Sequence, residues 1–234
     1  MKKGIEFKNI TKEYDVGEHK LTALNDVSFK INEGEFVVIL GPSGAGKSTI
    51  LNLLGGMEYA TSGSLTVNGK NIVGMGDNEL TEYRAENVGF VFQFYNLIPT
   101  LTAIENIALT KDIVKNPMDA SEVLDMVGLS EHAQQFPTQL SGGEQQRVSI
   151  ARAVAKNPTM LLCDEPTGAL DSETGIVVLS MLQEMNRKNG KTVIIVTHNA
   201  VLAEAADRVI RIKNGKIKEI IENDSPKAVS EVNW

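Results

Sequence analysis

Short apolar runs alternate along the chain with helix-like stretches, which is typical of parallel β-strands joined by helices. Runs that are apolar at nearly every position predict strands at 36–40, 88–92, 159–163 and 191–196. The stretches between them predict helices at 50–55, 78–87, 144–155 and 172–188. Because strands without polar alternation are buried on both faces, they indicate a parallel sheet flanked by helices. The pattern therefore predicts an α/β domain.

Both ends of the chain carry a different, antiparallel β pattern. Near the start, strands are predicted at 5–9 and 27–31 with a polar connection at 11–20, and a turn at 61–64 precedes a strand at 65–67. Asn68-Gly69 is a dipeptide typical of two-residue hairpins. Near the end, a closing hairpin is predicted from strands at 209–212 and 216–220 around Asn214-Gly215. The polar stretch 223–234 is expected to fray.

The pattern changes to short helices between the strand at 88–92 and the helix at 144–155. Thr102 and Glu105 have the spacing of a capping box, and Asn116-Pro117 offers an N-cap followed by proline at the first helical position. We expect one domain over 1–234, in which a helical subdomain of about 94–137 interrupts a catalytic core of 1–93 and 138–222, and a polar tail follows at 223–234.

Composition narrows the class of protein. With 234 residues, 42% of them hydrophobic, the chain can bury a sizeable core. A formal charge of −7 argues against nucleic acid as a partner, because phosphate contacts need a basic face. The single cysteine, Cys163, cannot form an internal disulfide and is expected to be buried. No apolar stretch has the length of a membrane span or signal region, so the chain is expected to stay in the cytoplasm.

A glycine-rich loop follows the first buried strand and precedes a helix. The spacing G-x-x-x-x-G-K-S lets successive backbone N–H groups converge on a phosphate at a helix N-terminus. Lys47 would then reach the outer phosphates, and the Ser48 hydroxyl would ligate Mg²⁺. Kinases, GTPases, motors and transporters all share such a loop, so it indicates a bound nucleotide and leaves the task open. The predicted phosphate-binding residues are Gly41, Pro42, Ser43, Gly44, Ala45, Gly46, Lys47, Ser48 and Thr49.

Two carboxylates end the apolar strand at 159–163. In α/β proteins ligands bind beyond the carboxyl ends of the strands, so Asp164 and Glu165 are placed to act on the same nucleotide. Asp164 can hold the Mg²⁺ shell, and Glu165 can orient or deprotonate the attacking water. The alternative is an exposed acidic turn before Pro166.

Leu140, Ser141, Gly142, Gly143 and Glu144 form a second glycine-containing helix start. Ser141 and Glu144 have capping-box spacing, which explains them by local structure alone. The two glycines are not needed for a cap, and they leave backbone N–H groups open to an anion. Two phosphate-binding helix starts in one chain suggest that two subunits hold one nucleotide between them.

With these motifs the sequence resembles ATP-binding cassette (ABC) ATPase subunits over essentially its whole length. The Leu-Ser-Gly-Gly-Glu signature is highly specific for that family. The resemblance implies a P-loop NTPase core with an antiparallel β portion and an inserted helical subdomain. In such proteins the phosphate loop of one copy and the signature of the other close on the same ATP. The implied activity is hydrolysis of ATP with Mg²⁺.

The resemblance also assigns roles to single positions. It implies that Tyr14 stacks on adenine, that Gln93 at the end of the strand at 88–92 contacts Mg²⁺ and water, and that His198 contacts the γ-phosphate. Asp164 becomes the metal-shell aspartate and Glu165 the catalytic base. The stretch Ala169, Leu170, Asp171 matches a loop that crosses the dimer interface. Because every motif is intact, two copies are expected to form a homodimer with two equivalent ATP sites.

A finer resemblance rests on 82–84, 88–99 and 101–106, which are similar to the macrolide exporter, lipoprotein-release, bacitracin-type peptide resistance and cell-division cassettes. That group implies a separate membrane permease subunit, often with an extracytoplasmic adaptor, and a place at the cytoplasmic face of the membrane. An apolar cluster is the expected permease contact, with a satellite core as the alternative; it comprises Phe94, Tyr95, Leu97, Ile98 and Leu101.

The leading hypothesis is therefore the ATP-hydrolysing subunit of a bacterial transporter that exports a drug, peptide or lipid-linked substrate. A second hypothesis is a regulatory cassette that transmits force through the membrane to a cell-wall enzyme without moving cargo. A third is a soluble cassette acting on DNA or ribosomes, whose members usually carry two cassettes or a long insertion. Neither of those features is seen in this sequence.

Overall fold

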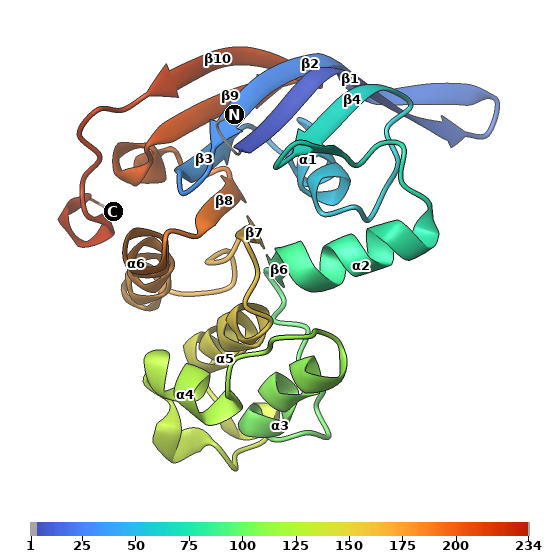
Figure 1. The fold of residues 1–234 in the computed structure, drawn as a ribbon. Coiled ribbons are helices and arrows are strands. Elements are labelled where there is room, and N and C mark those ends of the chain that lie inside the picture. Colours follow the sequence, from blue (N-terminus) through green and yellow to red (C-terminus); the bar gives the residue numbers. More distant parts are fainter. Residues whose placement is uncertain (1–3, 234) are drawn as a thin grey trace.

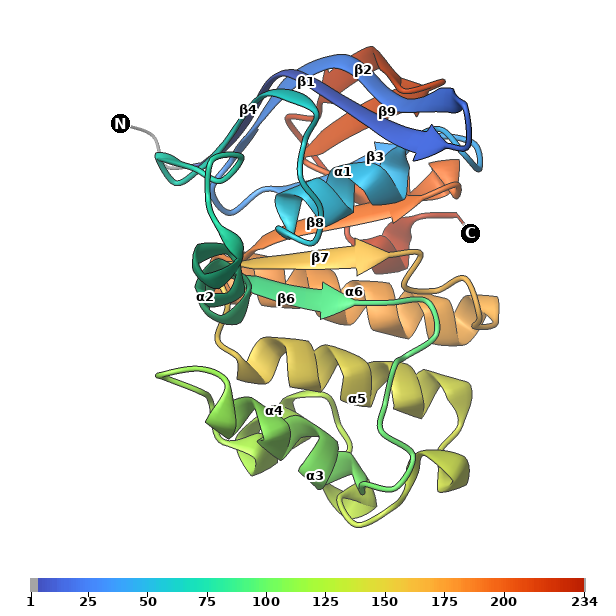
Figure 2. The same ribbon diagram turned by 90° about the vertical axis from the view of Figure 1, so that its right-hand side faces the viewer.

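A six-stranded sheet forms the centre of the computed structural model, which describes residues 4–233. Its central strands run parallel and side by side, as Figure 2 shows. The predicted α/β architecture is confirmed, with every residue of the strand at 36–40 buried. The strand order is β10 (Lys216–Glu222), β9 (Arg208–Lys213), β3 (Phe36–Leu40), β8 (Thr192–Thr197), β7 (Met160–Asp164) and β6 (Val88–Val91).

A second, antiparallel sheet covers one side of the first, with helix α1 (Lys47–Leu54) between them (Figure 1). Its order is β2 (His19–Asn32), β1 (Gly4–Val16), β4 (Ser62–Val67) and β5 (Lys70–Asn71). The predicted hairpin at Asn68-Gly69 is confirmed, since both residues have positive φ, 49° and 84°.

Two expectations for this sheet are wrong. The predicted polar connection at 11–20 is strand on both sides of a short turn, and the predicted turn at 61–64 lies mostly in β4. Pairing of β1 with β2 continues through several register shifts beyond Phe7 and out to Val16 and His19. Residues 15–22 are exposed, so the outer ribbon lacks the apolar alternation by which a strand is recognised.

Three longer helices agree closely with the sequence pattern. Their bounds are α2 (Asp77–Asn87), α5 (Gly142–Ala155) and α6 (Ser172–Asn189). The apolar positions of α5 and α6 pack on the face of the central sheet opposite α1, together with the residues of the helical insertion. Cys163 is fully buried in this cluster, as expected, and burial raises the pKa of its thiol.

The helical insertion lies below the sheet in Figures 1 and 2, packed on α5. It contains α3 (Ala103–Ala108), η1 (Leu109–Asp112), α4 (Ala120–Met126), η2 (Ser130–His132) and η3 (Pro137–Gln139). The capping box of Thr102 and Glu105 is confirmed. The helix start predicted at Asn116-Pro117 is wrong, because the Asp119 carboxylate caps α4 by accepting from the N–H groups of Ser121 and Glu122.

Residues 223–233 pack on the rest of the domain, so the expectation that this stretch frays is wrong for them, and Trp234 lies outside the described residues. The 3₁₀ helix η4 (Ala200–Ala205) precedes β9. A second one, η5 (Val229–Glu231), follows β10 and packs on α6. Val229 and Val232 are buried. Gln183 of α6 fixes the segment, because its Nε2 donates to the Lys227 carbonyl at 2.9 Å and its Oε1 accepts from the Val229 N–H at 2.9 Å.

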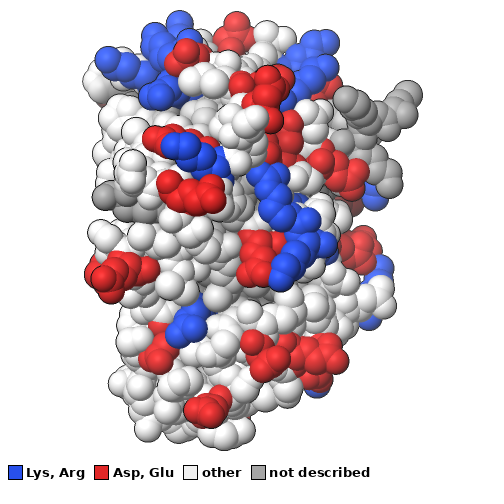
Figure 3. All heavy atoms as spheres, turned by 90° about the vertical axis from the view of Figure 1, so that its left-hand side faces the viewer, with Lys and Arg blue, Asp and Glu red and all other residues white. Residues whose placement is uncertain are grey.

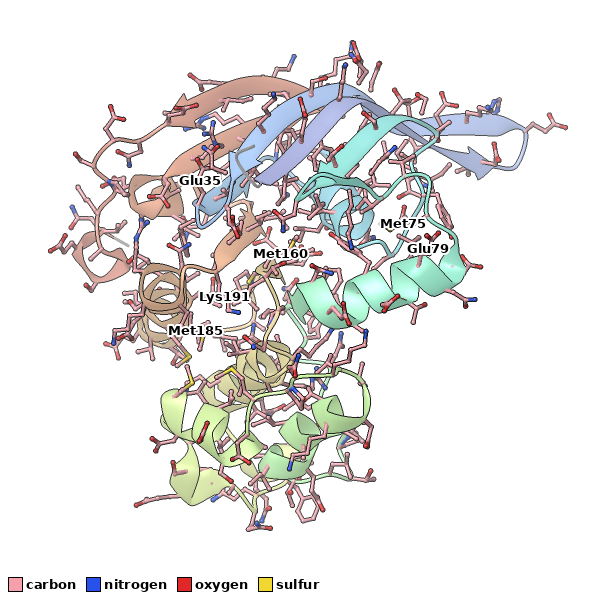
Figure 4. All side chains as sticks on the ribbon, viewed as in Figure 1. Glu35, Met75, Glu79, Met160, Met185 and Lys191 are labelled. Atoms are coloured by element: carbon pink, nitrogen blue, oxygen red, sulfur yellow. The ribbon has the colours of Figure 1, made fainter. Side chains whose placement is uncertain are left out.

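Charged groups are distributed rather than concentrated by sign. Figure 3 shows acidic and basic side chains interspersed over one face of the molecule. At the edge of the central sheet, Arg208 donates to Glu35 at 2.8 Å and to Glu222 at 2.7 Å, and Glu35 is labelled in Figure 4. Within residues 4–233, no helix combines the length and apolarity required to cross a membrane.

Candidate nucleotide-binding site

A cavity of about 810 Å³ lies where β3, β6, β7 and β8 end at their carboxyl termini. Parallel strands place the residues that follow them at one edge of the sheet, so segments far apart in sequence meet there. The cavity collects most of the predicted site residues in one place: Tyr14, Ser43, Gly44, Gly46, Lys47, Ser48, Thr49, Gln93, Asp164, Glu165 and His198.

The phosphate loop wraps the start of α1. Gly46 has φ 103°, and a Cβ there would lie 2.7 Å from the Ala23 carbonyl oxygen, so only glycine fits. A Cβ at Gly41 would lie 2.4 Å from the Ile212 carbonyl oxygen. The Lys47 ammonium donates to the carbonyls of Gly41 at 2.8 Å and Pro42 at 3.1 Å, so it lies against the loop itself.

Oxygen ligands suited to Mg²⁺ meet beside this loop. The Ser48 hydroxyl lies near the Asp164 carboxylate, and the Gln93 amide lines the same cavity. Burial raises the pKa of Asp164, the Ser48 hydroxyl opposes this effect, and the neighbouring Glu165 charge adds to it. Residues 4–233 contain no group of three or more His, Cys, Asp or Glu able to hold a metal. The Ser48 hydroxyl, the Asp164 carboxylate and the Gln93 amide oxygen supply part of a coordination shell, which fits an ion that takes its remaining ligands from water and substrate phosphates.

The Glu165 carboxylate is held by the end of the neighbouring strand β8. Its Oε2 accepts from the Thr197 hydroxyl at 2.9 Å, and its Oε1 lies 3.0 Å from Nδ1 of His198. The Glu165 backbone has φ 45°, and its N–H donates to the Val196 carbonyl at 3.0 Å. The sequence analysis missed Thr197, whose only signal is its position between a buried strand and His198.

Tyr14 lies on β1 at the rim of the cavity, and its hydroxyl donates to the Glu58 carboxylate. The Lys12 ammonium stands over the Tyr14 ring, 4.8 Å from the ring centroid. Burial and the bond to Glu58 raise the pKa of the Tyr14 phenol. No motif in the sequence marks Lys12 or Glu58, because Glu58 meets Tyr14 across 44 residues.

The signature residues lie at the first turn of α5, outside this cavity. The predicted capping box is confirmed, since the Ser141 N–H donates to Glu144 at 2.7 Å. The glycines also have a packing role that the sequence analysis did not predict. A Cβ at Gly142 would lie 2.8 Å from the Tyr95 hydroxyl, and one at Gly143 would lie 2.2 Å from the Thr174 methyl carbon.

The stretch Ala169, Leu170, Asp171 also lies outside the cavity and beside the signature. Asp171 caps α6, since its carboxylate accepts from the N–H of Thr174 at 2.9 Å and from its hydroxyl at 2.8 Å. Thr174 thus contacts both predicted interface segments. Within one chain these segments meet each other and do not complete the nucleotide cavity.

A buried glutamine that the sequence analysis missed joins two loops of the site. Gln146 of α5 is fully buried, and its Nε2 donates to the carbonyls of Phe92 at 3.2 Å and Pro166 at 2.8 Å. Phe92 precedes Gln93, and Pro166 follows Glu165, so this amide fixes the distance between them. Its Oε1 has no hydrogen-bond partner among the described residues. The available signal was a polar residue on the buried face of a helix.

The apolar cluster after Gln93 is divided between surface and core. Phe94 is 74% exposed and Ile98 is 39% exposed, whereas Leu97 packs against the core. Tyr95 and Asn96 both have positive φ, and Arg152 of α5 donates to both of their carbonyls. The surface hypothesis and the core hypothesis each describe part of the cluster.

Comparison with known proteins gives concordant results. The profile of the ABC transporter family matches residues 24–168. A putative ABC transporter ATP-binding protein of Mycoplasma pneumoniae is 43% identical over 98% of this chain, which spans 50% of that relative. The macrolide export ATP-binding/permease protein MacB of Aggregatibacter actinomycetemcomitans is 42% identical over 91% of this chain, which spans 34% of it.

A solved structure is similar over nearly its full length. It is the dimeric post-hydrolysis state of the ATP-binding cassette MJ0796 bound to ADP and Pi, a protein from Methanocaldococcus jannaschii. The TM-score is 0.86 at 43% identity, covering 93% of this chain and 98% of that one. The described fold is therefore shared along the whole cassette.

Proposed function

The chain belongs to the ABC transporter ATP-binding family, and from that premise we propose that it hydrolyses ATP as the nucleotide-binding subunit of an exporter. The observation that carries the proposal is the cavity in which the phosphate loop, Asp164, Glu165 and His198 meet. Within it, the loop N–H groups and Lys47 bind the phosphates, and Tyr14 binds the base. Ser48, Asp164 and Gln93 would hold Mg²⁺, which neutralises charge on the phosphates when bound.

Glu165 acts as the general base in this proposal. Its carboxylate orients the attacking water and takes a proton from it, which is the role that a strand-end acid beside the γ-phosphate can perform. Thr197 and His198 hold the two carboxylate oxygens, so the base has a fixed direction. His198, whose side chain is 73% exposed, is placed to contact the γ-phosphate.

We propose a homodimer in which each copy completes the other's site. Leu140 to Glu144 and Ala169 to Asp171 lie outside the cavity of their own chain, and the first of them begins a helix whose glycine N–H groups can bind an anion. A twofold arrangement would bring the signature of one copy onto the ATP held by the phosphate loop of the other. The dimeric form of the MJ0796 cassette supports this arrangement.

The permease partner is proposed to contact the exposed part of the cluster at Phe94 and Ile98. The relative MacB is named as a macrolide export protein with an ATP-binding part and a permease part, which supports a membrane partner and an export role for this chain. The substrate class remains a drug, peptide or lipid-linked molecule, with an extracytoplasmic adaptor as a further partner. In this proposal the helical insertion of 94–137 faces the permease at the cytoplasmic side of the membrane.

Glu165→Gln tests the catalytic assignment. General-base catalysis contributes about 10²- to 10⁴-fold, so the ATPase rate should fall by that order while ATP binding remains. Light scattering should then find an ATP-dependent dimer that does not dissociate. Glu219→Gln is the matched control, since Glu219 pairs with Arg211 on the exposed β10. A Glu165→Gln protein that turns over at the wild-type rate would refute the assignment.

Ile98→Asp tests the partner surface without touching the cavity residues. The variant should keep the basal ATPase rate, yet it should fail to co-purify the permease from membranes of the native cell. Ile113→Asp, at another exposed apolar position, is the control and should retain the permease. Equal recovery with both variants would place the contact elsewhere.

A further inference from the structure

A polar cluster lies behind the Tyr14 ring. Glu58, in the loop after α1, accepts a bond from the Tyr14 hydroxyl and another from the Asn52 amide at 2.8 Å. The Lys12 ammonium lies 3.6 Å from Glu58, donates to the Tyr59 carbonyl at 2.9 Å and stands 4.8 Å from the Tyr14 ring centroid. The side chains of Lys12 and Glu58 are only 14% and 24% exposed, so the ion pair is largely shielded from solvent.

The cluster lies outside the lining of the nucleotide cavity, and Tyr14 is the residue that both share. Tyr14, Leu21, Ala23 and Thr49 line the cavity, whereas Lys12 and Glu58 do not. Thr49, in the first turn of α1, lines the cavity close to the Tyr14 hydroxyl. Tyr14 therefore belongs both to the cavity and to the cluster, and Glu58 joins its hydroxyl to Asn52 of α1.

Tyr14 lies where burial along the ribbon ends. Its neighbours farther out, residues 15–22, are exposed, and Val16 and Leu21 are 58% and 59% exposed. A ring at the edge of such a ribbon would sample several directions unless other contacts restrain it. The polar contacts that restrain it are the hydrogen bond that its hydroxyl donates to Glu58 and the ammonium of Lys12.

We propose that Lys12 and Glu58 are positioning residues for the nucleotide base, because they fix the Tyr14 ring as a stacking platform at a set distance from the phosphate loop. This inference rests on the proposed function, in which Tyr14 binds adenine. A cation over one ring face attracts π-electron density, which favours an electron-rich purine on the side that faces the cavity. Asn52 extends the connection from Glu58 into α1, so base and triphosphate sites hold a constant separation.

Ligands with and without a base separate this role from a general effect on the phosphate loop. Calorimetry would compare a non-hydrolysable ATP analogue with inorganic tripolyphosphate for Lys12→Met and Glu58→Ala. Affinity for the analogue should fall about threefold to tenfold, while tripolyphosphate affinity stays the same. In steady-state assays KM for ATP should rise by the same factor and kcat should stay constant.

The controls come from the same ribbon. Lys20→Met and Glu13→Ala break an exposed pair next to Tyr14 and should leave both affinities unchanged. In a Tyr14→Ala background, Lys12→Met and Glu58→Ala should have no further effect, because they act through the ring. Glu58→Gln, which keeps the side-chain volume, serves as a second variant with a smaller loss of analogue affinity.

Several outcomes would overturn the inference. The inference is wrong if Lys12→Met and Glu58→Ala each bind the analogue as tightly as the wild type does. It is also wrong if either substitution still lowers analogue affinity in the Tyr14→Ala background. An equal loss of tripolyphosphate affinity would also overturn it, because Glu58 would then act on the phosphate loop through Asn52. A wild-type protein that binds neither ligand would instead refute the proposed function, and this inference with it.

Discussion

The contact between Gly143 and Thr174 allows a quantitative test of why the signature contains its second glycine. In Gly143→Ala the new Cβ would lie 2.2 Å from Thr174 Cγ2, whereas carbon atoms in contact prefer about 3.5–4.0 Å. Thr174 cannot easily rotate away, because its hydroxyl donates to Asp171 at 2.8 Å. Overpacking of this kind costs about 1–3 kcal/mol, and alanine returns up to about 1 kcal/mol through helix propensity.

We therefore expect Gly143→Ala to lose about 1–2 kcal/mol of unfolding free energy, measured by urea denaturation followed by circular dichroism. For a chain of this size the melting temperature should fall by about 2–8 °C. Thr174→Ser removes Cγ2 but keeps the hydroxyl that bonds to Asp171. The remaining Thr174 atoms would lie 3.6 Å and 3.8 Å from the new Cβ, so the double variant should regain wild-type stability.

Two results would contradict this reasoning. Gly143→Ala could unfold at the wild-type urea concentration, or Thr174→Ser could fail to restore the loss. The ATPase rate of the double variant carries separate information. A stable double variant without activity would indicate that Gly143 is also needed to leave its N–H group open to the nucleotide.

The other predictions concern the sheet edge, the buried glutamine and the C-terminal segment. Burial alone would raise the pKa of Glu35, but hydrogen bonds from Arg208 and Asn32 hold this pKa below its ordinary 4.5. These bonds therefore stabilise the folded state above pH 4.5, and this stabilisation is lost as the pH falls through the folded-state pKa. Arg208→Met should thus cost about 2 kcal/mol in urea unfolding at pH 7, and a difference from the wild type that fails to narrow as the pH falls well below 4.5 would count against the pairing. Gln146→Leu should lose about 1–3 kcal/mol, because two loop carbonyls lose their donor, and its ATPase rate should fall even at temperatures where it is fully folded; normal activity would show that those loops need no such tie. Val232→Asp should lower the melting temperature by several degrees by placing a charge at a 5% exposed position, and an unchanged melting curve would show that the terminal segment does not contribute to stability.

The central architecture could be predicted because its information is local. The strands at β3 and β8 are buried on both faces, so their apolar runs and the glycine spacing between Gly41 and Gly46 are visible in a short window of sequence. The outer ribbon of β1 and β2 could not be predicted from apolar runs, because its strands stay paired where their side chains are exposed. At the start of α4 the sequence favoured Asn116 as the cap because proline follows it, whereas the structure places Asp119 there.

The same distinction applies to the candidate site. Residues within motifs, such as Lys47 and Asp164, were predicted by spacing, and the fold brings them to one cavity. Thr197 and Glu58 act on motif residues from 32 and 44 positions away in sequence, so no local pattern contains them. Supporting contacts of this kind depend on which strands and loops become neighbours, and that information exists only after folding.

The hydrogen bond from Thr197 of β8 to Glu165 has a consequence for how such cassettes diverge in evolution. One of the two side chains that hold the Glu165 carboxylate is Thr197, whose hydroxyl belongs to none of the recognised motifs. A descendant chain could therefore become slow at hydrolysis, and hold its nucleotide for longer, by replacing Thr197 alone. Every motif by which cassettes are classified would then stay intact, although the rate of hydrolysis and the lifetime of the bound nucleotide had changed.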